Sequence, residues 1–237
     1  MSILISNLSS EQKGVLDELT EVFCSEGSEL DRSDVLRFCV ARDFDKEKSQ
    51  AMLQAHIGWR KATLPIEKTP SVQDSLSKRR FYYLCQDKTN DRPIVYVNLL
   101  RYVQDKSYDP QTELQASLYT IENEVAPRIK RDSVGSHAWS MLLDISGIKS
   151  PPLAFLQLMN STYEANYPER LHRMVMFPVN SFVKKIIQGI LVFVDPKTRA
   201  KFYFVNTVKE LVELADVDNV QELGDDVKSL IVSKNLT

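Results

Sequence analysis

The residue types that most often perform chemistry are few and scattered in this 237-residue chain. The three histidines show no spacing typical of metal ligands. The three cysteines form no CxxC pair, which predicts free thiols in a reducing compartment rather than a disulfide framework or a redox site. We therefore expect no metal centre and no redox site. The cysteines are Cys24, Cys39 and Cys85, and the histidines are His56, His137 and His172.

The glycines exclude several classes of enzyme. The chain has 7 glycines, and no two of them form a GxG pair. A dinucleotide fingerprint and a phosphate-binding P-loop both need clustered glycines. The GxSxG sequence of a serine hydrolase elbow is also missing. These three large classes of enzyme are therefore unlikely on the sequence alone.

The charges are separated along the chain although they nearly cancel. The formal net charge is −2, which argues against binding to nucleic acid through bulk positive charge. Residues 181–209 contain six basic residues against one acid, a local charge of +5. Residues 210–237 contain seven acids against two lysines, a local charge of −5. The basic stretch is therefore the segment most suited to an anionic ligand or an anionic membrane surface.

That basic stretch begins with a strongly apolar helical pattern over Ser181–Val194. Phe182, Ile186 and Ile190 recur at helical spacing, and Lys184 and Lys185 lie on another side. The pattern allows two interpretations. It is typical of a core helix packed on a sheet, and it is also typical of a movable apolar cover whose lysine pair faces anionic lipid. Gly189 would weaken such a helix in its middle.

The remaining elements predict a helical layer followed by an α/β domain. Residues 1–72 show three helical patterns, the first with a capping-box pair at Ser9 and Gln12. Beyond them, strands alternate with helices, which favours a layered sheet with parallel pairs. We expect strands over Phe81–Cys85, Pro93–Leu99, Trp139–Ile145, Arg173–Pro178 and Phe202–Val205, helices between them, and a last helix over Lys209–Ala215.

Six sequence motifs, in the right order, resemble the CRAL-TRIO family. The motifs occupy residues 35–45 (VLRFCVARDFD, similar to LLRFLRARKFD), 51–61 (ending in WRK), 91–96 (DRPIVY, similar to GRPV), 143–148 (LDISGI), 166–171 (NYPERL) and 191–201 (LVFVDPKTRAK, similar to FLDPxTxxK). Each motif is weak alone, but the set is specific.

The resemblance implies a fold and a division into domains. Residues 1–72 would form the helical N-terminal domain, and residues 73–237 the lipid-binding domain. The fold class is α/β, with a mixed, largely parallel sheet flanked by helices and an apolar pocket. The helix before the DP motif would act as a gate, and Phe182, Lys184, Lys185, Ile186 and Ile190 would contact the membrane.

The resemblance to the phosphatidylinositol-transferring branch also implies a headgroup site. A phosphodiester needs a fixed cation and hydroxyl donors, and an inositol ring needs acceptors for its hydroxyls. Val40 and Asp43 depart from the family pattern, which commonly has basic residues there. The residues matching the family site are Arg42, Glu169, Arg170, Thr198 and Lys201.

We therefore predict a soluble lipid-transfer protein. It would bind one phospholipid, phosphatidylinositol first and phosphatidylcholine second, and exchange it between membranes. Two alternatives stay open, namely a lipid-sensing adaptor and a carrier of a tocopherol, retinoid or sterol-like molecule. We expect a cytoplasmic protein that is peripherally associated with anionic membranes, has no nucleic-acid partner and needs no cofactor beyond its bound lipid.

Overall fold

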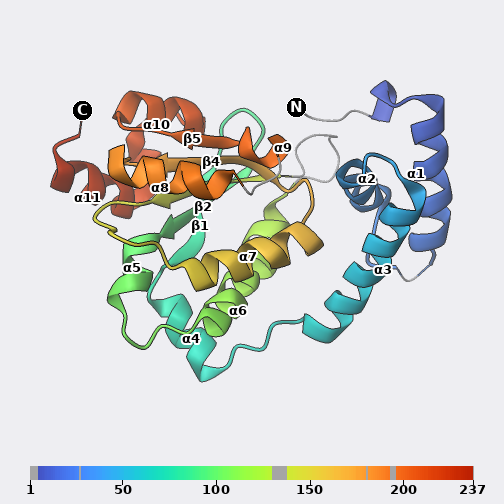
Figure 1. Ribbon diagram of the computed structural model, residues 1–237, viewed down its shortest axis with the longest axis horizontal. Helices are drawn as coiled ribbons and strands as arrows, with labels where there is room; N and C mark the ends of the chain where they lie inside the picture. Colours follow the sequence, from blue (N-terminus) through green and yellow to red (C-terminus); the bar gives the residue numbers. More distant parts are fainter. Residues whose placement is uncertain (1–4, 27, 130–137, 180, 193–195, 237) are drawn as a thin grey trace. The chain divides into compact units, whose positions relative to one another are not determined.

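The computed structural model describes residues 5–26, 28–129, 138–179, 181–192 and 196–236. The chain folds into two compact units. The described part of unit 1 comprises residues 5–26, 28–67 and 159–170, and that of unit 2 comprises residues 68–129, 138–158, 171–179, 181–192 and 196–236. Figure 1 shows both units and labels most of their helices and strands.

Unit 1 is built from the N-terminal helices η1 (Ile5–Asn7), α1 (Ser10–Phe23), α2 (Arg32–Ala41) and α3 (Lys46–Thr63). Ser9 and Gln12 form the predicted capping box at the start of α1. Asp31 and Asp45 cap α2 and α3 in a similar way, because their side chains accept hydrogen bonds from backbone N–H groups of the first turn. The three helices share one apolar core, which includes Leu16, Leu19, Val35, Phe38 and Leu53.

Unit 2 contains a five-stranded sheet in the order β1-β2-β3-β4-β5. Its strands are β1 (Phe81–Gln86), β2 (Pro93–Asn98), β3 (Trp139–Asp144), β4 (Leu171–Phe177) and β5 (Phe202–Phe204). β1 and β2 form an antiparallel pair, and the other neighbours pair in parallel. The prediction of a mixed, largely parallel sheet is therefore confirmed, with all six residues of β3 buried.

The helices of unit 2 include several that the sequence pattern did not predict. The sequence pattern missed α4 (Pro70–Ser77), α5 (Leu99–Gln104) and α11 (Gly224–Lys234). Because α11 follows α10, the expectation of a last helix ending at Ala215 was wrong. The other helical elements are α6 (Pro110–Thr120) with η2 (Ile121–Val125) and η3 (Ala126–Arg128), α7 (Leu153–Asn166), α8 (Ser181–Leu191), α9 (Pro196–Arg199), α10 (Val208–Ala215) and η4 (Val220–Leu223).

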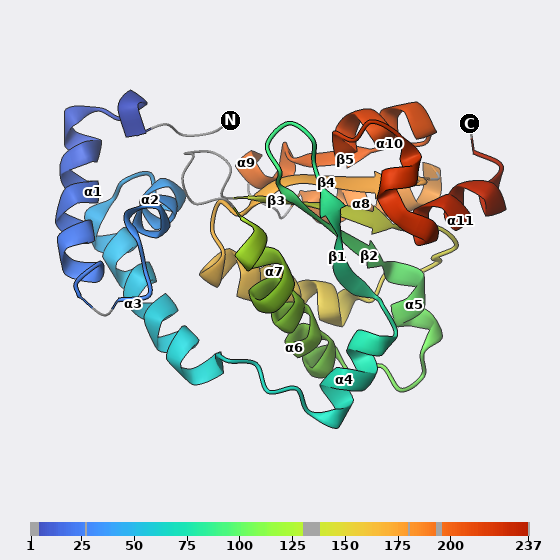
Figure 2. The ribbon, with the colours of Figure 1, turned by 180° about the vertical axis from the view of Figure 1, so that it is seen from behind.

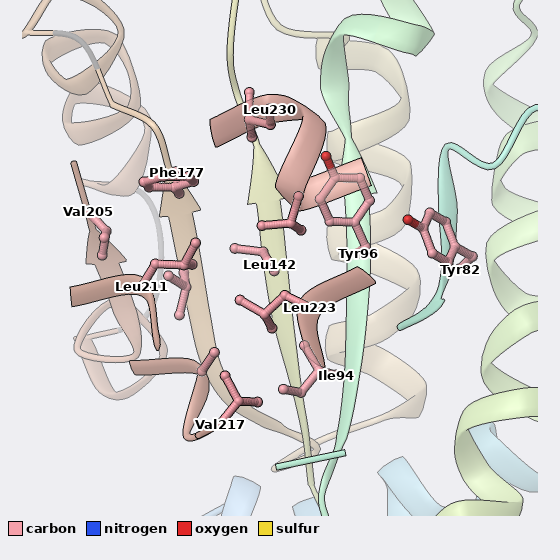
Figure 3. Packing of buried hydrophobic residues seen from close by; sticks show 13 residues of the cluster. Tyr82, Ile94, Tyr96, Leu142, Phe177, Val205, Leu211, Val217, Leu223 and Leu230 are labelled. Carbon is pink, nitrogen blue, oxygen red and sulfur yellow. The ribbon is translucent and has the colours of Figure 1, made fainter. Parts of the chain in front are cut away.

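One face of the sheet, which we call the α10 face, is closed by the C-terminal helices α10, η4 and α11. Leu211 and Leu223 are fully buried there, in one cluster with the sheet residues Leu142 and Phe177 (Figure 3). Figure 2 shows the helices α10 and α11 in front of the sheet. At one end of this face the Tyr82 hydroxyl donates a hydrogen bond of 2.6 Å to Asp226 of α11. The α10 face is thus a packed core of branched and aromatic side chains.

Candidate functional site

The helix α8 is apolar in sequence but exposed in the structure. Phe182 is 66% exposed, and Val192, directly after the helix, is 64% exposed. Lys184 and Lys185 are also exposed, and Leu191 is buried. The side chain of Ile190 and the end of the predicted helix at residues 193–194 lie outside the described residues. Two large apolar side chains therefore stand in water on the same helical segment as two lysines.

The face of the sheet opposite to α10 lies toward α8, and we call it the α8 face (Figure 1). The Lys184 ammonium is 5.6 Å from the centroid of the Phe204 ring, an attractive cation–π contact that joins α8 to β5. Because side chains alternate between the faces of a sheet, Phe204 shares its face with Met176, its partner on β4.

The strand register extends the α8 face into two apolar rows. Both rows cross the sheet from β1 to β5, and the members on β2, β3 and β4 are buried. Three of these members are methionines, whose flexible thioethers adapt to apolar groups of varied shape. One row is Tyr83, Val95, Met141, Met174 and Phe202, and the other is Phe81, Val97, Leu143, Met176 and Phe204.

Thr198 and Lys201 lie at the amino end of β5. Pro196 starts the short helix α9, and the Lys201 N–H donates to the Thr198 carbonyl over 3.0 Å. The Lys201 carbonyl in turn accepts a hydrogen bond of 2.8 Å from the Met174 N–H of β4. Both side chains are half-buried. The three-residue spacing therefore places a hydroxyl and an ammonium on one tight turn beside the sheet.

Arg42 belongs to unit 1 and ends the helix α2. Its backbone N–H donates to the carbonyls of Cys39 and Val40, and its guanidinium Nη1 lies 3.3 Å from the Ala41 carbonyl. The next residue, Asp43, has a φ of 51°, a left-handed conformation in which Asp is tolerated. The helix therefore stops directly behind Arg42, which leaves this arginine half-buried at a helix end.

Arg170, also in unit 1, takes part in a buried ionic network. Asp34 Oδ1 accepts from Arg37 Nη2 at 2.6 Å and from Arg170 Nη2 at 3.1 Å. Arg37 Nη1 donates to the Pro168 carbonyl at 2.9 Å. Burial alone would raise the pKa of Asp34, but Arg37 and then Arg170 outweigh it and lower that pKa to about 2. This network ties α2 to the turn after α7.

Glu169 is the exposed member of that turn. Its φ is 56°, a left-handed conformation that costs a non-glycine residue free energy. The turn is held on both sides of Glu169, by Arg37 at Pro168 and by Asp34 at Arg170. The backbone at Glu169 is thus fixed, and the residue is exposed.

The predicted headgroup residues divide between the two units. Arg42, Glu169 and Arg170 lie in unit 1, and Thr198 and Lys201 lie in unit 2 with α8. Sequence reasoning missed Asp34 and Arg37, although their three-residue spacing on a helix is the usual spacing of an ion pair. No signal in the sequence indicated that Arg170 would join them.

Other kinds of site find no support in the part of the chain that the structure describes. No cluster of three or more His, Cys, Asp or Glu side chains there could hold a metal ion. Within the same residues, every helix is too short or too polar to cross a bilayer. The three cysteines are free thiols, and burial raises the pKa of Cys39 to about 11.

A comparison with models of known protein families shows to which family this chain belongs. A family model described as CRAL/TRIO domain matches residues 77–224. The chain therefore belongs to the CRAL/TRIO domain family, a family of lipid-binding and lipid-transfer proteins, as its six motifs predicted.

Three curated relatives illustrate the range of the similarity. "Protein real-time" of Anopheles gambiae is 27% identical over 221 residues, which cover 84% of this chain and 32% of the relative. "SEC14 cytosolic factor" of Eremothecium gossypii is 26% identical, with 90% of this chain and 76% of the relative covered. "Phosphatidylinositol/phosphatidylcholine transfer protein SFH11" of Arabidopsis thaliana is 27% identical, with 80% and 55% covered. The chain thus spans about a third of the length of the first relative.

The crystal structure of Sfh5 has the same fold. It superposes with a TM-score of 0.71 at 14% sequence identity, and the match covers 96% of this chain and 97% of the other. The prediction of an α/β fold with a mixed sheet flanked by helices is therefore confirmed by a solved structure as well as by the strand pairing.

Proposed function

We propose that the protein binds a single phospholipid and exchanges it between membranes. Phosphatidylinositol is the first proposed ligand and phosphatidylcholine the second. The names of the Arabidopsis and Eremothecium relatives support a transfer protein acting in the cytosol. We place this protein in the cytoplasm, in transient contact with anionic membrane surfaces. Exchange of a lipid needs no covalent step.

The observation that carries the proposal is the exposure of α8. A helix with this sequence is expected to bury its apolar side, yet Phe182 and Val192 remain in water. Lys184 and Lys185 lie on the same segment, and basic residues gain about 1 kcal/mol each near an anionic membrane. An apolar, basic and exposed helix is suited to enter the surface of a bilayer and to move when it does.

The two rows of the α8 face are the proposed contact for the acyl chains. Each methylene moved from lipid to water costs ~0.8 kcal/mol, so a free two-chain lipid with some 30 methylenes would cost on the order of 20 kcal/mol. A carrier must replace most of the apolar contacts of the bilayer. The adaptable side chains of Met141, Met174 and Met176 support this role.

The headgroup would be held by the motif residues. Within unit 2, we assign Lys201 as a cation for the phosphodiester and Thr198 as a hydroxyl donor. Within unit 1, the family resemblance assigns Arg42 as a cation and Glu169 as an acceptor for the inositol hydroxyls. Arg170 contributes through its ion pair with Asp34, which fixes the turn that presents Glu169.

Native mass spectrometry of the protein as purified tests the ligand assignment. We expect a mass increment of one phosphatidylinositol per chain after incubation with mixed phospholipid vesicles. The variant Lys201→Ala should lose this increment, and Lys209→Ala, which removes an exposed lysine further along the chain, should keep it. Retention of a sterol-like or tocopherol-like molecule, with phospholipid ignored, would overturn the assignment.

A further inference from the structure

The imidazole of His172 lies at the amino end of β4, where the sheet is irregular. Trp139 pairs with Leu171 and Ser140 pairs with Arg173, so His172 is the additional residue of a β-bulge. Bulges often turn a side chain toward a functional site. Arg92 Nη1 lies 3.3 Å from His172 Nε2. Because a guanidinium can only donate, Nε2 accepts, and the neutral ring keeps its proton on Nδ1.

Basic groups surround this ring from three elements of unit 2. Arg92 comes from the turn before β2, Arg173 from β4 itself, and Lys201 from the turn before β5. Asp87 and Asp91 are acidic residues of the same turn as Arg92, and Asp87 Oδ2 lies 3.5 Å from Arg92 Nη1. Arg173 donates a hydrogen bond of 2.9 Å to the Leu214 carbonyl. Because a carbonyl is neutral, this bond does not cancel the positive charge of the guanidinium.

The basic groups around His172 disfavour its protonated form. Burial and then the charges of Arg92, Arg173 and Lys201 lower the pKa of His172 to about 4. The ring is therefore neutral at physiological pH in a field that repels a further proton. An anion placed beside the ring would reverse that effect, because its charge favours the imidazolium.

We propose that His172 and Arg92 form a second anion-binding position beside Lys201, suited to a phosphate monoester. The position rests on the proposed function, in which Lys201 holds the phosphodiester of a bound lipid. A phosphate monoester carries a charge of about −1.5 to −2 near pH 7, compared with −1 for a phosphodiester, and offers three acceptor oxygens. The Nδ1–H of His172 and the Arg92 guanidinium are matching donors. The corresponding ligand class is phosphatidylinositol monophosphate.

Titration with short-chain lipids tests this inference. Dioctanoyl phosphatidylinositol and its 3-, 4- and 5-monophosphates would be titrated separately into the wild-type protein, His172→Gln and His172→Arg. We expect at least one monophosphate to bind the wild type about tenfold more tightly than phosphatidylinositol does. His172→Gln should abolish this ratio while the affinity for phosphatidylinositol stays unchanged, and His172→Arg should retain the ratio. Thermal unfolding of each variant verifies that it is folded.

The outcomes separate this inference from the proposed function. Binding of phosphatidylinositol with no preference for any monophosphate, or a preference that survives in His172→Gln, overturns the second position alone. A wild-type protein that binds none of these lipids overturns the proposed function. Inorganic phosphate and inositol 1,4-bisphosphate form the remaining arms. If either binds as tightly as the monophosphates in a His172-dependent way, the position belongs to a free anion and the lipid assignment is wrong.

Discussion

The two amphipathic helices α8 and α10 lie on opposite faces of one sheet and differ in how they are packed (Figures 1 and 2). In α10, Leu211 is fully buried and Ala215 is 5% exposed. In α8, Phe182 is 66% exposed, and Ile186 is only half-buried. The apolar side of α10 thus contributes to the core, whereas in α8 the described apolar side chains before Leu191 are exposed or half-buried.

The ends of α10 are also fixed. The Thr207 side chain accepts from the Glu210 N–H over 3.2 Å, and Glu210 accepts from the Thr207 N–H over 3.2 Å, a capping box at its start. An amphipathic sequence pattern therefore does not by itself show what the apolar side of a helix contacts. One pattern here serves stability, and the other is free to serve binding.

Shortening a buried side chain of α10 should give the largest effect on stability. Leu211→Ala removes a fully buried side chain and leaves a cavity, so we expect the free energy of unfolding to fall by about 3 kcal/mol. Phe182→Ala in α8 should change it by less than about 0.5 kcal/mol, because most of that ring is already in water. Urea unfolding measures both values. Equal losses would show that the two helices are packed alike.

Removing the charges of α8 should weaken membrane binding. For the double variant Lys184→Gln, Lys185→Gln we expect a loss of about 2 kcal/mol, or about 30-fold, in affinity for vesicles that contain phosphatidylserine. The matched control removes Lys228 and Lys234 of α11, on the other side of the sheet, and should leave the affinity unchanged. Vesicle sedimentation at low salt measures both. If the α11 variant loses as much affinity, the membrane does not distinguish the two sides.

Removing the cap of α10 should cost about 1 kcal/mol of stability. Thr207→Ala leaves the Glu210 N–H without its acceptor, whereas Thr207→Ser keeps the hydroxyl and should stay close to the wild type. Denaturant midpoints measure the difference. Neither variant should alter lipid transfer. Slower transfer by Thr207→Ala would show that α10 takes part in transfer, contrary to the contrast drawn between α8 and α10.

A glycine in α8 tests whether this helix bends during lipid exchange. An added Cβ at Gly189 or at Gly58 of α3 meets nothing within 4 Å, so alanine fits at both positions. Each substitution should stabilise its helix by up to about 1 kcal/mol. If α8 bends during exchange, Gly189→Ala should slow lipid transfer about fivefold, and Gly58→Ala should not. Equal transfer rates in the two variants would exclude bending at Gly189.

The sheet could be predicted from the sequence because its strands are marked by strong local signals. The apolar run of residues 139–145 predicted a strand buried on both faces, and the polar turn at 86–92 predicted the β1–β2 hairpin. Helices were missed where tertiary contacts outweigh the local pattern. The six-residue α5 begins directly at the end of β2, and α11 begins at Gly224, which has a φ of 72°.

The site could be predicted only in part. Motif resemblance selected Glu169 and Lys201, but not the ion pair between Asp34 and Arg170, which are 136 positions apart in sequence. The hydrophobic period of residues 181–191 is the same for a buried and an exposed helix, so the sequence left its two interpretations open. The exposure of Phe182 now favours the membrane-facing one.

An intermembrane transfer assay tests the central claim most directly. Donor vesicles would contain labelled phosphatidylinositol, and unlabelled acceptor vesicles would be separated after incubation with the protein. The account predicts transfer that increases in proportion to protein concentration and that falls in Lys201→Ala but not in Lys209→Ala. One phosphatidylinositol bound per chain, with no transfer above the rate between vesicles alone, would contradict it.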